Sequence, residues 1–252
     1  MHAYSDIAMI LTEALGLEQP PVAVSFVDQV PPDVPRWSGA VPAGCRFWQE
    51  AAIRVFATSA PDHERCAIGQ YTHALDMSGA AATDLQDALR VFADLTYVTA
   101  EDLAAIPVLQ QKAAHVVYGP LALTPLPPDV VLLFVHPGQT LILSEASQQT
   151  EGGLPPAMGR PACAVVPQTR NSGRSALSLG CCGARAYLDV MNNDVALYAV
   201  PGVSIAAFAD RVAALAKANA ILTTFHQIRR RDIEAGQTPT IRQSLAALES
   251  GG

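Results

Sequence analysis

Apolar residues along the first part of the chain recur at helical spacing. The first such run lies between Ser5, a good N-cap, and Gly16, which supplies a stop, and it predicts a helix. The same spacing predicts helices over 45–57, 83–92 and 141–149, and Thr99 with Asp102 resembles a capping box for a short one. The longest periodic run predicts an amphipathic helix over 204–230.

Other parts of the chain carry short runs of valine and other strand-forming residues. They predict strands over 21–27, 115–123, 130–136, 175–179 and 195–200. The segment 30–44 holds four prolines and two glycines, so it is predicted to be a loop, as is 152–161. The segment 162–170 fits a short helix or a strand equally well.

Strands interleaved with helices predict the fold class. We expect one α/β (or α+β) domain over 1–235, in which a mixed sheet is flanked by helices. No low-complexity linker divides this span. Residues 236–252 are polar, so a partly mobile tail is expected there.

Composition and charge narrow the classes of function. Half of the 252 residues are hydrophobic, which allows a substantial core. The formal net charge is −7 and the acidic residues are spread along the chain, so we expect no nucleic-acid partner. The opening residues MHAYSDIAMI lack the features of a secretory signal, and the longest aliphatic or aromatic run is only 130–135. We therefore expect no membrane association and a cytoplasmic location.

The five cysteines are the clearest candidates for chemistry. Their number is odd and no export signal precedes them, which favours reduced thiols over a disulfide framework. Cys45 follows Gly44 where a helix should begin, and Cys181 follows Gly180. Glycine lets the backbone approach a bulky inorganic group, and the free N–H groups at a helix start stabilise thiolates.

Cysteine spacing hints at two degenerate halves, at about 20–110 and 115–230. Twenty residues separate Cys45 from Cys66, seventeen separate Cys163 from Cys181, and each pair follows a valine-rich strand. Each half would give two thiolates to a shared site. Four thiolates suit either a four-iron cluster or a tetrahedral zinc ion.

Two other interpretations of the same residues stay open. The short C-x-x-C pair is absent, and free cysteines are often small buried hydrophobes. Alternatively, His63 and His73 with Cys45 and Cys66 could form a Cys₂His₂ zinc site within the first half.

Six sequence motifs together carry a family resemblance. They are PPVAV at 20–24, CRFW at 45–48, HERCAIGQYTH at 63–73, GRPAC at 159–163, SLGCCGARAY at 178–187 and PG at 201–202. Over about residues 15–230 the chain resembles the prokaryotic family named domain of unknown function 169.

The resemblance implies the fold and a set of ligands. It implies Cys45, Cys66, Cys163 and Cys181 as the four ligands, with Cys182 a bystander at a place that is commonly aliphatic. The chain departs from the family pattern at Ala184, where asparagine is usual, and at Asn193, where an acidic residue is usual. These departures argue against a polar role there. The activity of the family is not established, so no reaction is implied.

We therefore expect an iron–sulfur protein with a four-iron (4Fe-4S) cluster on these four cysteines, acting in electron transfer, redox sensing or small-molecule redox chemistry. Whether it is an enzyme stays open. The expected partner is a redox protein or a small molecule. The alternative is a zinc-binding or metal-free small-molecule-binding protein with reduced core cysteines.

Four basic or imidazole side chains lie within four residues of the candidate ligands. They are expected to bind the cofactor or an anionic substrate beside it, although the arginines could merely offset thiolate charge; they are Arg46, His63, Arg65 and Arg185.

Overall fold

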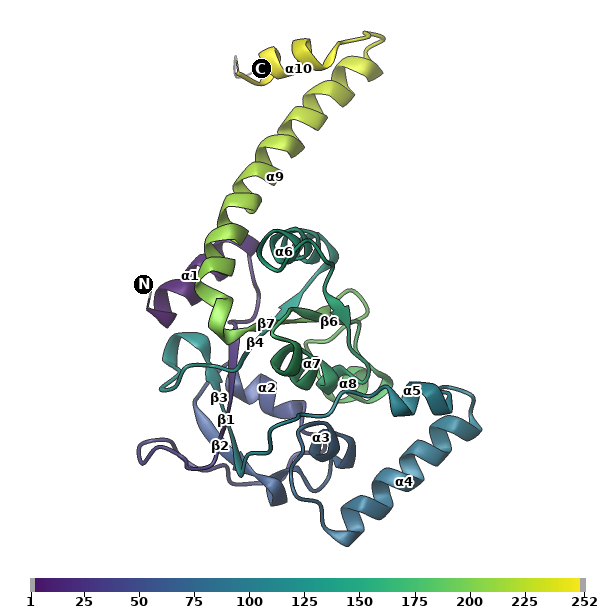
Figure 1. Cartoon of the computed structure of the whole chain (residues 1–252). Coiled ribbons are helices and arrows are strands. Elements are labelled where there is room, and N and C mark those ends of the chain that lie inside the picture. Colours follow the sequence, from purple (N-terminus) through teal and green to yellow (C-terminus); the bar gives the residue numbers. More distant parts are fainter. Residues whose placement is uncertain (1–2, 250–252) are drawn as a thin grey trace.

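A mixed β-sheet forms the centre of the protein in the computed structural model, which describes residues 3–249 (Figure 1). Within these residues the sheet has seven strands in the order β2-β3-β1-β4-β7-β6-β5. Adjacent strands are antiparallel except for the parallel pair β5 and β6. The strands are β1 Val22–Val27, β2 Phe56–Ser59, β3 His115–Pro120, β4 Val130–Val135, β5 Ala157–Met158, β6 Ala176–Ser178 and β7 Ala196–Pro201.

Helices lie on both faces of the sheet, which confirms the predicted mixed α/β class. The α-helices are α1 Tyr4–Leu15, α2 Arg46–Ala51, α3 Ala67–Thr72, α4 Gly79–Asp94, α5 Ala100–Ala104, α6 Pro137–Thr150, α7 Val165–Ser172, α8 Cys182–Tyr187, α9 Ile205–Glu234 and α10 Ile241–Glu249. Short 3₁₀ turns are η1 Ala60–His63, η2 Leu121–Leu123, η3 Ala162–Ala164 and η4 Gly202–Ser204.

Strand β4 explains why the sheet is covered twice. All six of its residues are buried, and successive side chains of a strand point to opposite faces. Val130, Leu132 and Phe134 join a core with α2, α7 and α8. The alternate residues, 131, 133 and 135, join a second core with α1, α6 and α9. Each face therefore needs its own helical layer.

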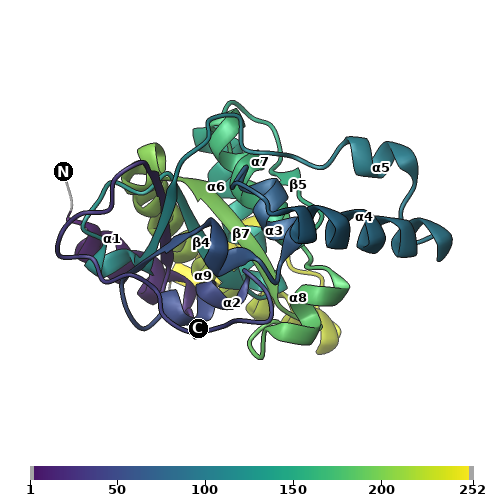
Figure 2. The same ribbon diagram turned by 90° about the horizontal axis from the view of Figure 1, so that it is seen from below.

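Two helical segments extend away from these layers. One is the hairpin of α4 and α5, which projects sideways, and the other is α9, which continues far beyond the sheet and carries α10 at its end (Figures 1 and 2). Helix α4 buries only Ala81, and α5 has no buried residue. Both segments therefore leave much of their surface uncovered by the body of the protein.

The structure changes several predicted boundaries. The helix expected over 45–57 ends at Ala51, and Phe56–Ser59 forms β2, pairing with β3. Helix α4 begins earlier than predicted, at Gly79, because Ser78 caps it by accepting a hydrogen bond from the N–H of Ala81. The ambiguous segment 162–170 is helical.

The C-terminal segment and the division of the chain into domains were the two larger features predicted from the sequence. The tail expected after residue 235 contains α10, which packs back against α9. The single domain and the two degenerate halves stay predictions, and β3 of the second half lies between β1 and β2 of the first. Over residues 3–249, no helix is both long and apolar enough to span a membrane.

Gly202, in the turn after β7, packs against the backbone of the loop that precedes β4. A Cβ atom there would lie 1.7 Å from the carbonyl oxygen of Pro128, while the Gly202 N–H donates to the carbonyl of Asp129. Gly202→Ala should lower the free energy of unfolding by about 3 kcal/mol or more, because backbone must move to make room. Urea unfolding measures this change.

Gly138, in the first turn of α6, provides the matched control. A Cβ atom there meets nothing within 4 Å. Gly138→Ala should leave stability unchanged or raise it by up to about 1 kcal/mol. Equal stability of the Gly202→Ala variant and the wild type would show that the turn packs differently.

Candidate functional site

The predicted cysteine ligands lie at the starts of helices on one side of the sheet. Cys45, Cys66 and Cys181 occupy the N-cap positions of α2, α3 and α8, and Cys163 lies in η3, just before α7. Cys45 and Cys163 belong to the core that contains α2 and α7, and Cys66 and Cys181 pack against that core. The helix start predicted at Cys45 is therefore confirmed, and the structure adds helix starts at Cys66 and Cys181.

The electrostatics of these thiols are dominated by burial. Burial raises the pKa of Cys45 to about 12, with smaller contributions from Cys66 and Cys181. Burial also raises the pKa of Cys163 well above its usual range, again with contributions from the other three cysteines. The four side chains thus interact with one another in one region. Cys45 and Cys163 are neutral thiols at physiological pH.

The individual sulfur atoms are engaged in local packing. The Thr72 hydroxyl donates to Cys163 Sγ at 3.4 Å, and the N–H of Ala184 donates to Cys181 Sγ at 3.4 Å. A Cβ atom on Gly69 would lie 2.9 Å from Cys66 Sγ, so this sulfur packs directly on the α3 backbone. These sulfurs behave as core atoms with weak hydrogen bonds.

This geometry corrects the expected function. Among residues 3–249, no group of three or more His, Cys, Asp or Glu side chains is arranged to hold a metal ion. The prediction of a protein whose function rests on a four-iron cluster is therefore wrong. Spacing along the chain indicated which cysteines share a region, but it does not determine how their sulfur atoms point. Zinc as the alternative cofactor stays a prediction.

Two buried histidines lie beside the thiols. The rings of His63 and His73 have centroids 6.3 Å apart, and the side chains are 1% and 3% exposed. His63 Nε2 lies 2.9 Å from the Thr58 hydroxyl, and His73 Nδ1 donates to the carbonyl of Gly69 at 2.9 Å. Within the described chain, His63 Nδ1 and His73 Nε2 have no hydrogen-bond partner.

Burial lowers the pKa of both histidines. It brings the pKa of His63 to about 3, with a further contribution from His73, and the pKa of His73 to about 4. Both rings are therefore neutral at physiological pH. Together with the protonated thiols of Cys45 and Cys163, they make this part of the core uncharged.

The three candidate arginines have different surroundings. Arg46 forms an ion pair with Asp189 at 3.1 Å and lowers the pKa of Cys45 against the effect of burial. Arg185 donates to several backbone carbonyls of the 179–195 segment, including that of Asn192, and so supports the loop after α8. Arg65 is exposed. A role for these arginines and His63 in cofactor binding stays a prediction.

A cavity of about 260 Å³ lies where the α4–α5 hairpin meets the body. Side chains of α3 and α8 form the opposite wall. Most of the lining is aliphatic or aromatic, and it includes the thiol-bearing Cys181 and exposed Cys182. The lining residues are Ile68, Leu89, Phe92, Tyr97, Val98, Asp102, Leu103, Ile106, Arg160, Pro161, Cys181, Cys182, Gly183 and Tyr187.

One ion pair supplies the polar part of the cavity wall. Arg160 lies 3.4 Å from the Asp102 carboxylate, and its guanidinium stands over the Tyr97 ring at 5.5 Å. Backbone and side-chain hydrogen bonds from Thr99 lower the pKa of Asp102, as does Arg160, so the carboxylate is ionised. Arg160 is about half exposed, which leaves guanidinium N–H groups available to a bound molecule.

The sequence alone does not reveal this cavity. The signal available was the helical spacing of Leu89 and Phe92 in α4, which marks an apolar face. Such a face normally packs on the core of its own domain. Only the fold shows that it faces a space instead.

Fold and site together define a mixed α/β protein with an uncharged thiol-containing core beside an apolar cavity. The chain belongs to the family named domain of unknown function 169, described as uncharacterised ArCR, which it matches over residues 10–209. This confirms the resemblance carried by the sequence motifs. No curated protein and no solved structure matches the chain.

The buried histidines predict acid sensitivity. Because their folded-state pKa values lie below the usual 6.5, the unfolded chain binds protons at a higher pH than the folded protein does. The stability they contribute is present above pH 6.5 and is lost as the pH falls toward 4. Each should reduce the free energy of unfolding by about 1.4 kcal/mol per pH unit in this range.

Urea unfolding between pH 7 and 4.5 measures this dependence. In the His73→Gln variant the free energy of unfolding should fall less steeply with decreasing pH, by a slope that corresponds to about one proton. His226→Gln, at an exposed position on α9, is the control and should leave the pH dependence unchanged. The same dependence in the His73→Gln variant as in the wild type would contradict the assignment.

Proposed function

We propose that this protein binds a small, largely apolar organic molecule that carries a hydrogen-bond acceptor at one end. The single observation that carries the proposal is the apolar cavity under the α4–α5 hairpin. Ligand sites are typically concave and apolar with a few placed polar groups, and this cavity is near the small end of their size range.

The packing of the hairpin supports an occupant. Leu89 and Phe92 are only half-buried although they face the body, and α5 buries no residue of its own. A molecule that covers roughly 100 Å² of this apolar surface would contribute about 2.5 kcal/mol before the costs of binding. The same contact would fasten the hairpin to α3 and α8.

Arg160 is the reason for proposing a hydrogen-bond acceptor at one end of the ligand. Its guanidinium keeps N–H groups beyond those directed at Asp102 and the carbonyl of Tyr97, and these can donate to a carbonyl or carboxylate oxygen. Tyr97 and Tyr187 on the wall suit an apolar chain or ring.

We also propose that the protein works in the cytoplasm. The support is the state of its cysteines, because all five are free, including exposed Cys182. Free thiols persist in a reducing compartment.

Octanoate and 1-octanol probe the proposed site because they share a chain and differ in the polar end. We expect saturable binding of both by isothermal titration calorimetry, with octanoate tighter. Leu89→Trp should fill the cavity and weaken both at least tenfold. Arg160→Gln should weaken octanoate several-fold and leave octanol nearly unchanged, because only the charged end uses the guanidinium.

Val91→Trp is the matched control, since Val91 lies two residues away on the same helix, is exposed and does not line the cavity. It should bind both probes like the wild type. Absence of saturable binding to the wild type, or equal loss in the Leu89→Trp and Val91→Trp variants, would refute the proposal.

A further inference from the structure

The central segment of helix α9 is exposed to solvent, because no other part of the described chain packs against it. Its first part is buried against α1 and α6 through residues such as Phe208 and Val212. Its last part packs on α10, where Phe225 and Ile228 are buried. Between them, all residues of 217–224, which we call the α9 bridge, are exposed. This bridge is about 12 Å long.

The α9 bridge is more apolar than an exposed helix needs to be. Ile221 and Leu222 are 49% and 53% exposed. The hydroxyl of Thr223 donates to the carbonyl of Asn219 at 2.8 Å, and that of Thr224 donates to the carbonyl of Ala220 at 3.2 Å. These hydroxyls are satisfied inside the helix, so the threonines present methyl groups. Burying such a surface is favourable.

Charge is distributed unequally between the two ends of the molecule. Residues 1–212 contain eleven Lys or Arg and twenty Asp or Glu, a net charge of −9. Residues 213–252 contain five Lys or Arg and three Asp or Glu, a net charge of +2. The arm formed by the end of α9 and α10 therefore suits the body of another copy, which is acidic.

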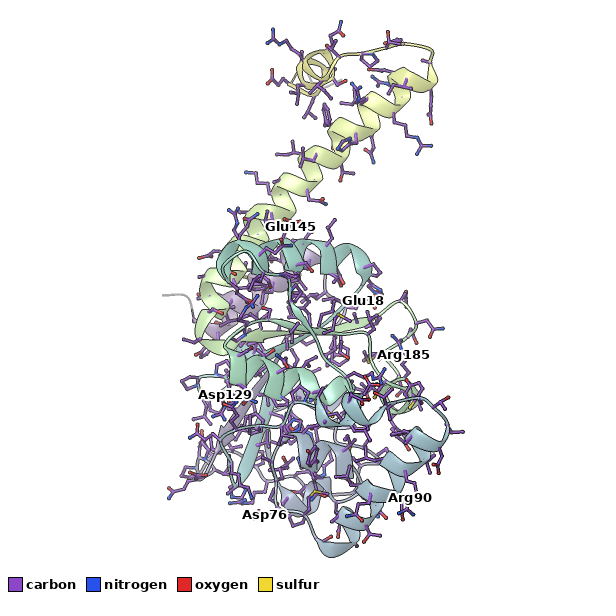
Figure 3. The ribbon with its side chains drawn as sticks, turned by 45° about the vertical axis from the view of Figure 1, so that its right-hand side comes forward. Glu18, Asp76, Arg90, Asp129, Glu145 and Arg185 are labelled. Atoms are coloured by element: carbon purple, nitrogen blue, oxygen red, sulfur yellow. The ribbon has the colours of Figure 1, made fainter. Side chains whose placement is uncertain are left out.

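An antiparallel crossing of two α9 bridges brings these charges together. With the two-fold axis near residues 220 and 221, the basic stretch 229–231 of each copy lies beside 210–212 of the other, where the charges of Asp210 and Arg211 cancel. The attraction therefore comes from carboxylates on the neighbouring helices. The exposed carboxylates Glu13 of α1 and Glu145 of α6 belong to the helices around that end of α9. Figure 3 shows Glu145 where α9 leaves the body.

We propose that two copies of this chain form a symmetric dimer through their α9 bridges, crossed antiparallel, with Ile221 and Leu222 in the interface. Ala218 lies one turn before Ile221 and Leu222 on the same face of the helix and lets the two helices approach closely. The arm of each copy then lies over the acidic body of its partner. This proposal is independent of the ligand cavity, which lies at the other projecting segment.

Light scattering coupled to size-exclusion chromatography tests the dimer with the full chain. At about 50 μM the wild type should have twice the mass of one chain. Leu222→Glu should shift the protein to a single chain by weakening association at least a hundredfold, because it places a charge in the interface. Because Leu222 is exposed in the single chain, the Leu222→Glu variant should fold normally as a monomer. Its circular dichroism spectrum and melting temperature check this.

Val203→Glu is the control, because Val203 is 95% exposed and lies outside the α9 bridge. It should leave the dimer intact. A wild type with the mass of one chain at this concentration, or a Leu222→Glu variant that keeps twice that mass, would overturn the proposal. A dimer that Leu222→Glu and Val203→Glu disrupt equally would overturn it as well.

Discussion

The burial of β4 on both faces is the constraint on which the rest of the structure depends. A strand whose six residues are all apolar needs a helical layer on each side of the sheet. One layer, with α1, α6 and α9, anchors the long helix that leaves the body. The other layer collects the helix starts that carry the thiols. Both projecting segments therefore start from one or the other side of a single sheet.

The thiol-containing core is apolar in composition, and the two buried thiols and two buried histidines within and beside it are uncharged. Burial raises the pKa of Cys45 and Cys163 and lowers the pKa of His63 and His73, so each effect favours the neutral form. A neutral core can pack tightly behind the apolar cavity, whose wall includes Cys181. The cavity then becomes the place where the fold offers space to a molecule from outside.

Sequence patterns predicted the elements that local chemistry determines. The β4 run, the helix stop at Gly16 and the α9 periodicity correspond to the structure, and the motifs identified the family. The expected N-cap Ser5 instead lies inside α1, whose N-cap is Ala3. The pattern failed at Phe56, whose helical spacing coincided with strand propensity and which pairs with Tyr118 of β3. It also failed for the iron–sulfur function, since the directions of sulfur atoms follow from packing between distant segments. The cavity depends on such packing too.

Iron and acid-labile sulfide per chain, measured on protein purified without oxygen, test most directly whether these thiols are packed core groups. Thiols packed in the core give a colourless protein with far less than one iron per chain. About four irons per chain, with broad absorption near ~400 nm, would contradict this packing.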